Sequence, residues 1–267
     1  MKSLITVAAT LSLFAATIAS SLAVASVAGN ELGAKRQDSG AVDEAKPGQE
    51  SAAVYETKAI EGWTVRVNER LLKDAGEATA KALELLGIQL REIVRVVPAP
   101  AVVSLREVTL WFSPDYPGVK PSAEYHPGRG WLVENHRNPA MVKGVEFTDI
   151  PMFEAEMNRM PNFVLHELAH SYHDRVFGFD NVEVAAAYER AKAGKIYDAV
   201  ERWHGIGRPN TTERAYAMTN PQEYFAECTE AFFSRNDFFP FTREELAQHD
   251  PEMFKLLQRL WNQPTPK

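Results

Sequence analysis

The stretch HELAHSYHD, residues 166–174, combines three histidines with two acidic side chains. A neutral histidine nitrogen can bind a metal ion, and HExxH on a helix places two such nitrogens one turn apart. At a rise of ~1.5 Å per residue, His166 and His170 lie about 6 Å apart along the helix axis. The two imidazoles can converge on one divalent ion, so the spacing predicts one Zn²⁺ per chain.

Three further residues of the stretch have different expected roles. Glu167 lies beside the metal position, where its carboxylate can accept a proton from a zinc-bound water and act as the general base. His173 lies about 10.5 Å from His166 along the axis, which excludes it as a ligand of the same ion on an unbroken helix. Asp174 is predicted to accept a histidine N–H or to fix a neighbouring loop.

A zinc site with two histidines needs a third protein ligand. The longer motif HExxHxxGxxH would place a histidine at position 176, where this sequence has valine, so the metzincin class is excluded. An acidic ligand from a later helix remains. Seven glutamates qualify by position: Glu183, Glu189, Glu201, Glu213, Glu223, Glu227 and Glu230.

The sequence NPQEYFAECTEAFF favours one group of these glutamates. Asn220 can cap a helix, and Pro221 suits its first turn. Glu223, Glu227 and Glu230 then share one helix face within about 60°. Three carboxylates on one face repel each other unless a cation compensates them. We therefore expect Glu223 to be the third ligand and Glu227 to accept a hydrogen bond from a ligand histidine.

Alternatives to this site remain open. Glu223 also fits a capping box with Asn220, which would explain it without a metal. Glu189 lies 19 residues after His170, the interval used by gluzincin aminopeptidases, although its surroundings indicate an exposed amphipathic helix. In a metal-free interpretation, the histidines of the motif bond to Asp174 and to nearby backbone groups.

The motif HELAHSYHD, followed by Tyr216 and then by EYFAE from Glu223, resembles the gluzincin peptidases of the anthrax lethal factor and Pro-Pro endopeptidase type. The resemblance covers about residues 160 to 235 and implies a zincin-like peptidase with zinc completed by Glu223. It also implies that Tyr216 assists the transition state. Ala169 and His173 depart from that family's usual residues, which affects the expected substrate preference.

The pattern of apolar residues predicts the elements that position the motif. A helix is expected from Glu69 to about Leu86, with an extension to Val97, and helices resume at about Met160. This order predicts an α+β fold: a small mixed or antiparallel sheet, an HExxH helix and a helical C-terminal part. The segment 142–147 is a candidate exposed sheet edge that aligns a peptide. Strands are expected at 54–60, 62–68, 102–112, 131–134 and 142–147.

The N-terminal segment has the composition of a targeting sequence. Residues 1–28 contain one lysine, an apolar run and then small residues, which predicts a signal peptide; an uncleaved membrane anchor is the alternative. Residues 29–53 are rich in Gly, Ala, Ser, Glu and Lys and predict a flexible leader. Residues 54–267 then form one metallopeptidase domain. We expect the protein to be secreted, extracellular or periplasmic, without stable membrane association after cleavage.

Charge and cysteine content narrow the classes of partner and site. The formal net charge is -7, which disfavours binding to nucleic acid, and Cys228 is the single cysteine, which excludes an intrachain disulfide. The predicted partner is a peptide or protein substrate. The predicted function is a secreted zinc peptidase; the alternatives are a zinc-binding module without turnover and a zinc hydrolase of non-peptide amides.

Overall fold

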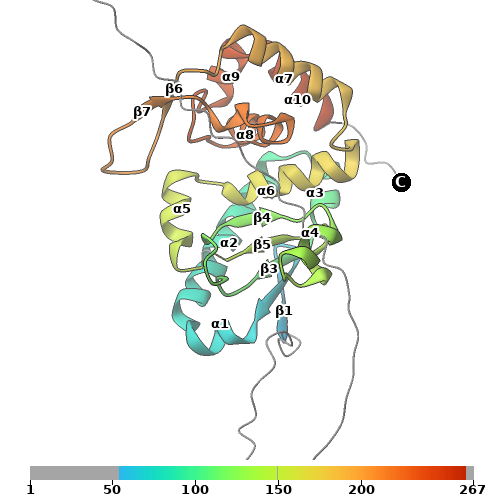
Figure 1. The fold of residues 1–267 in the computed structure, drawn as a ribbon, viewed down its shortest axis with the longest axis vertical. Helices are drawn as coiled ribbons and strands as arrows, with labels where there is room; N and C mark the ends of the chain where they lie inside the picture. Colours follow the sequence, from blue (N-terminus) through green and yellow to red (C-terminus); the bar gives the residue numbers. More distant parts are fainter. Residues whose placement is uncertain (1–53, 149, 263–267) are drawn as a thin grey trace, which may run out of the picture. The chain divides into compact units, whose positions relative to one another are not determined.

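The computed structural model describes residues 54–148 and 150–262. A mixed five-stranded sheet with helices beside it is followed by a helical C-terminal part (Figure 1). This arrangement confirms the predicted α+β class. The signal peptide expected at 1–28 and the leader expected at 29–53 lie outside the described residues. Among the helices of the described segments, none is long and apolar enough to cross a membrane.

The sheet contains parallel and antiparallel pairs. Its strands are β1 (Tyr55–Ile60), β2 (Trp63–Asn68), β3 (Leu110–Phe112), β4 (Ala123–Tyr125) and β5 (Val145–Phe147). Their order is β1-β2-β3-β5-β4, with β2, β3 and β5 parallel and the two outer strands antiparallel to their neighbours. The prediction that the segment 142–147 forms an exposed sheet edge is therefore wrong, because β5 is paired on both sides. The free edges belong to β1 and β4.

Local sequence explains how the first hairpin and helix form. Glu61 and Gly62 both have positive φ, 50° and 91°, as a tight turn between antiparallel strands requires. The side chain of Asn68 then accepts a hydrogen bond from the N–H of Arg70 at 2.9 Å. Asn68 therefore caps the helix that begins at Glu69.

Five helices belong to the half of the molecule that contains the sheet. They are α1 (Glu69–Asp74), α2 (Gly76–Val96), α3 (Ala99–Leu105), α4 (Arg129–Glu134) and α5 (Phe153–Arg159). Two segments that were predicted to be strands lie partly or wholly in these helices. The first part of 102–112 is helical because Ala101, Val102 and Leu105 are buried at helical spacing. The segment 131–134 belongs to α4, which buries Leu132 and leaves its neighbours exposed.

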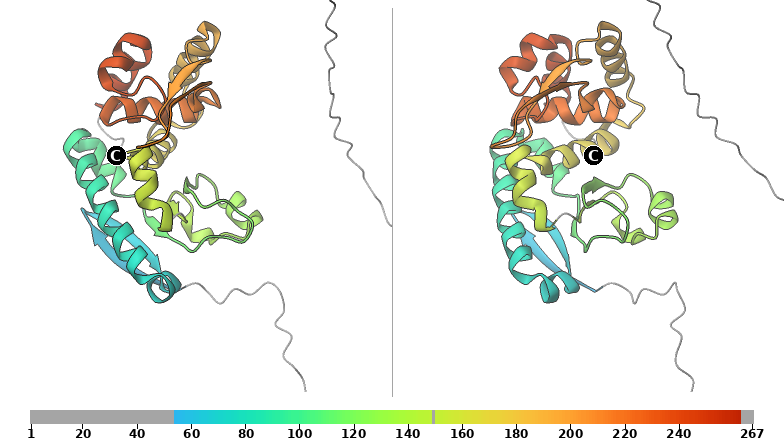
Figure 2. Two further views of the ribbon diagram at one scale, coloured as in Figure 1. Left: turned by 90° about the vertical axis from the view of Figure 1, so that its left-hand side faces the viewer. Right: turned by 60° about the vertical axis from the view of Figure 1, so that its left-hand side comes forward.

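The HExxH motif lies on α6, which begins the second half of the chain. The remaining elements are α6 (Phe163–Tyr172), α7 (Val182–Gly194), β6 (Val200–Arg202), β7 (Thr211–Glu213), η4 (Tyr216–Met218), α8 (Pro221–Phe233), α9 (Arg243–His249) and α10 (Pro251–Leu260). After Tyr172 the α-helix gives way to a π-helical turn, His173–Phe177. Figure 2 shows α6 between the sheet and the C-terminal helices, and it contacts both β4 and α8.

A buried charged cluster supports β4 and β5 on the face opposite the main core. Glu146 Oε2 lies 3.0 Å from both Arg137 Nη1 and His126 Nε2, and Tyr116 O–H donates to Glu146 Oε1 at 2.7 Å. His126 is only 2% exposed. His136, in the connection after α4, is by contrast exposed. The cluster therefore stabilises the edge strand β4 on the face of the sheet opposite the main core.

Candidate metal centre

Three potential metal-ligand atoms converge between α6 and α8. His166 Nε2 lies 3.1 Å from His170 Nε2 and 3.2 Å from Glu223 Oε2, and His170 Nε2 lies 3.3 Å from the same oxygen. A tetrahedral Zn²⁺ with ligand distances of ~2.0–2.1 Å requires ligand atoms about 3.3–3.4 Å apart. The donor atoms and their spacing therefore fit a zinc ion, with a fourth position left for water or substrate.

The two helices position these ligands through local features of the sequence. His166 and His170 are four residues apart on α6, so their side chains project from one face. Asn220 begins α8, and its side chain accepts a hydrogen bond from the N–H of Glu223 at 2.8 Å. The carboxylate of Glu223 faces the histidines. Glu189, the alternative ligand, has a 67% exposed side chain on α7 beside Lys192.

The charge states of Glu223 and His170 suit metal binding, whereas a metal at His166 must displace a proton. Although burial opposes it, hydrogen bonds from His166 and His170 lower the pKa of Glu223. Its carboxylate therefore stays ionised at neutral pH, as a metal ligand must. Burial lowers the pKa of His170, which favours the neutral imidazole that binds metal. Burial also disfavours a charged His166, but hydrogen bonds to Glu223 and Glu230 raise its pKa.

A buried glutamate fixes the orientation of His166. The Nδ1 atom lies 2.7 Å from Glu230 Oε1 and 3.9 Å from Glu227 Oε1. The acceptor expected at Glu227 is thus found at Glu230. Helix periodicity explains the difference: Glu230 follows Glu223 by seven residues, or two turns, and faces almost the same direction. A proton on Nδ1 leaves the Nε2 lone pair free for the metal.

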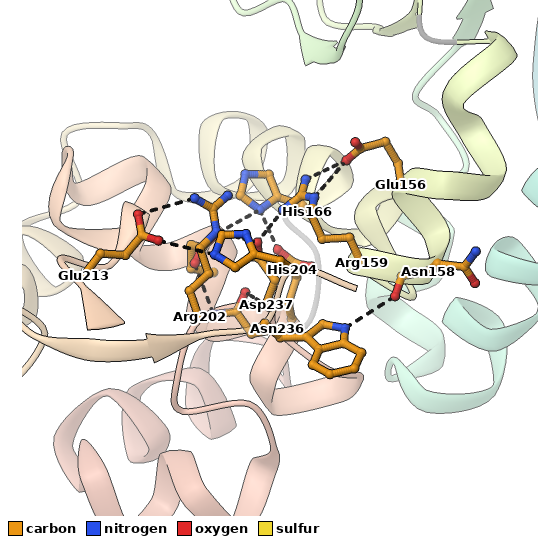
Figure 3. A network of polar contacts seen from close by, with 12 residues as sticks. Glu156, Asn158, Arg159, His166, Arg202, His204, Glu213, Asn236 and Asp237 are labelled. Atoms are coloured by element: carbon orange, nitrogen blue, oxygen red, sulfur yellow. Dashed lines mark hydrogen bonds and ion pairs between the residues drawn. The ribbon is translucent and has the colours of Figure 1, made fainter. Parts of the chain in front are cut away.

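Glu227 instead belongs to a polar network that leads away from the metal centre. Asn236 Nδ2 donates to Glu227 Oε2 at 3.0 Å, and the N–H of Asp237 donates to Asn236 Oδ1 at 2.9 Å. The carboxylate of Asp237 pairs with Arg159 and with Arg202 (Figure 3). The burial of Glu227 and the nearby charges of Asp237 and Glu230 raise its pKa. The network joins the metal centre to the β6–β7 hairpin.

Glu167 is partly buried beside the candidate ligands. Its Oε2 accepts a hydrogen bond of 2.8 Å from the N–H of Tyr125 in β4. Burial raises the pKa of Glu167 to about 8, and the charge of Glu223 acts in the same direction while that of His166 opposes it. A divalent cation in the centre favours the ionised form. Glu167 directly follows the candidate ligand His166 on α6, and its carboxylate is held against β4.

Tyr216 lies in η4, just before α8, and is 48% exposed. Partial burial and the charge of Glu223 raise the pKa of its phenol. The hydroxyl therefore stays protonated at neutral pH and can donate a hydrogen bond. The turn η4 packs against α8, the helix that carries Glu223.

The last two residues of the motif, His173 and Asp174, contact other parts of the fold. Asp174 Oδ2 accepts hydrogen bonds from Tyr125 O–H, at 2.7 Å, and from Lys143 Nζ. Of its two expected roles, the contacts favour fixing a neighbouring segment. His173 is fully buried, with Phe179 and Phe225 against its ring. It therefore serves packing, in keeping with its exclusion as a ligand.

Comparison with known families identifies the class of this site. Residues 148–262, which include α6 and α8, match the family model described as glucose-regulated metallo-peptidase M90. No curated protein and no solved structure matched the chain. The matched segment is similar to the M90 metallopeptidases and contains the His-His-Glu set of potential metal ligands, so the protein is an enzyme of the zinc metallopeptidase class. The matching family is M90, not the lethal factor type that the motifs resemble.

Proposed function

We propose that this protein hydrolyses peptide bonds with one zinc ion held by His166, His170 and Glu223. The observation that carries the proposal is the triangle of ligand atoms, 3.1–3.3 Å on each side, beside the carboxylate of Glu167. When bound, zinc supplies a Lewis acid that polarises the scissile carbonyl and lowers the pKa of water to about 7.

The chain's own residues supply the proton transfers. Glu167 accepts a proton from the attacking water and passes it to the amine that leaves when the C–N bond breaks. Tyr216 donates a hydrogen bond to the oxyanion that forms from the carbonyl oxygen. Its raised pKa supports this role, because only the protonated phenol can donate. The resemblance to the lethal factor type supports the same assignment of Tyr216.

The free edge of β4 aligns an extended substrate beside these groups. The backbone groups of Ser122 and His126 bond to the β5 side, which leaves those of Ala123 pointing away from the sheet. Tyr125, two residues along, already donates to Glu167. A peptide that pairs with Ala123 therefore runs past the general base. The edge strand is β4, which replaces the segment 142–147 in this role.

An unbiased peptide library tests the function. Zinc-loaded protein is expected to cleave internal peptide bonds. The Glu167→Gln variant should cleave the same bonds far more slowly. Zinc binding without any cleavage would favour a binding module, whereas cleavage of non-peptide amides alone would favour an amide hydrolase. Secretion remains a prediction from residues 1–28, and detection of the mature chain outside the cytoplasm tests it.

A further inference from the structure

A groove of about 300 Å³ opens beside Tyr216. Two of its lining residues, Ala215 and Phe238, are buried and apolar, whereas the others carry polar or charged groups. Tyr216 lines this groove and lies in η4, which packs against α8, the helix that carries Glu223. Because Tyr216 is the proposed oxyanion donor, a group bound in the groove lies close to the scissile peptide bond. The polar lining residues are Arg202, Glu213, Arg214, Tyr216 and Thr219.

Arg202 is held rigidly in the groove wall. Its Nε donates to Asp237 Oδ2 at 3.3 Å, and Asp237 is only 1% exposed and also pairs with Arg159 (Figure 3). The guanidinium carbon lies 4.5 Å from the centre of the Phe238 ring. A guanidinium fixed in this way loses little side-chain entropy when it binds a ligand.

The groove offers more hydrogen-bond donors than acceptors. A guanidinium has five N–H groups. Arg214 uses Nε alone, to Asp198 at 3.4 Å, and Arg202 uses Nε and a 3.5 Å contact from Nη1 to Glu213. The other N–H groups of both arginines have no partner among the described side chains and backbone.

Glu213, the one acidic lining residue, is already bonded. Its Oε1 accepts a hydrogen bond of 2.6 Å from Thr211 Oγ1, and its Oε2 faces Arg202. Two arginines with free donors therefore face the groove against one carboxylate whose oxygens have partners. This balance favours an acceptor with negative charge, since a charge-assisted pair with arginine is bidentate and strong.

We infer that this groove is a substrate subsite for a carboxylate, and that the enzyme prefers peptides with Asp or Glu close to the scissile bond. The inference rests on the proposed peptidase function. Arg202 and Arg214 bind the substrate carboxylate, while the Phe238 ring and Ala215 contact its methylene groups.

Paired peptides that differ only by Glu or Gln at one position test the subsite. Zinc-loaded wild-type protein is expected to cleave the best Glu peptide with a kcat/KM about 10- to 100-fold above that of its Gln partner. Arg214→Met and Arg202→Met should each bring this ratio close to one. Arg208→Met, in the connection between β6 and β7 but outside the groove lining, is the matched control and should keep the ratio.

Binding measurements separate the subsite from the chemistry. Calorimetry on the Glu167→Gln variant should show the same preference for Glu peptides in Kd, and adding Arg214→Met should remove it. Equal binding and equal cleavage of Glu and Gln peptides by protein with intact arginines would overturn the subsite alone. Preferential binding with no cleavage of any peptide by the wild type would overturn the proposed function and support the subsite.

Discussion

Tyr125 holds α6 at two points. Its N–H donates to Glu167 at 2.8 Å, and its O–H donates to Asp174 at 2.7 Å. The edge strand β4 is therefore connected directly to Glu167, the proposed general base, and, seven residues later, to the turn that ends the helix. In the proposed mechanism, this connection fixes the distance between a substrate paired with β4 and the carboxylate of Glu167.

Removal of the general base should separate catalysis from metal binding. Glu167→Gln keeps the size of the side chain but removes its basic oxygen, so kcat should fall by about 10²–10⁴-fold. The zinc content, measured by mass spectrometry of the intact protein, should stay at one ion per chain. A variant that retains full activity would assign the base to another residue.

Glu223→Gln tests the third ligand. Loss of the ionised oxygen should lower zinc affinity by more than about 100-fold, because it removes an anionic ligand and not only the support of one. Glu189→Gln, on exposed α7, is the control and should bind zinc as tightly as the wild type. Competition with a chelator of known affinity measures the zinc affinity of both variants. Equal affinities in the two variants would exclude Glu223.

Glu230 and Glu227 should differ in their effect on the metal. Glu230→Gln weakens the 2.7 Å contact that orients His166 and should lower zinc affinity by about 10- to 100-fold. Glu227→Gln leaves that contact in place, so its effect on zinc affinity should be smaller. The reverse order, measured by the same chelator competition, would show that Glu227 supports the histidine.

Tyr216→Phe removes a hydrogen-bond donor while keeping the ring. If the phenol binds the oxyanion, kcat should fall by about 10²–10³-fold with little change in KM. Steady-state kinetics on one well-cleaved peptide distinguish this from a binding role. A raised KM with an unchanged kcat would mean that Tyr216 only binds substrate in the groove.

The burial of His173 should make the stability of the fold decrease as the pH falls. Burial lowers its folded pKa to about 4 from the ordinary 6.5, so the unfolded chain takes up a proton first as the pH falls. Its contribution is fully present above pH 6.5 and is lost between 6.5 and 4, which amounts to about 3 kcal/mol at 1.36 kcal/mol per pH unit. Urea unfolding of metal-free protein should show this loss.

The matched variant for this test is His173→Leu, which keeps an apolar side chain against Phe225 and Phe179. Its unfolding free energy should change less between pH 6.5 and 4 than that of the wild type. If both proteins show the same slope, the acid sensitivity arises from other groups, and His173 is not the residue that titrates.

Features that depend on neighbours in the sequence were predictable. The pairing of His166 with His170 follows from helical periodicity, and the cap at Asn220 follows from the hydrogen-bonding capacity of its side chain. The hairpin at Glu61 and Gly62 follows from the backbone conformation that the turn requires. Each of these features is decided within a few residues, so the local sequence contains the needed information.

Features that depend on distant contacts required the tertiary structure. The edge position of β4, the burial of His126 against Glu146, and the choice of Glu230 over Glu227 all join residues from separate elements. Periodicity places carboxylates on a helix face, but it cannot say which one meets a histidine 64 residues earlier. Packing of α6 against α8 decides that contact, because the relative rotation of two helices is set by the side chains between them.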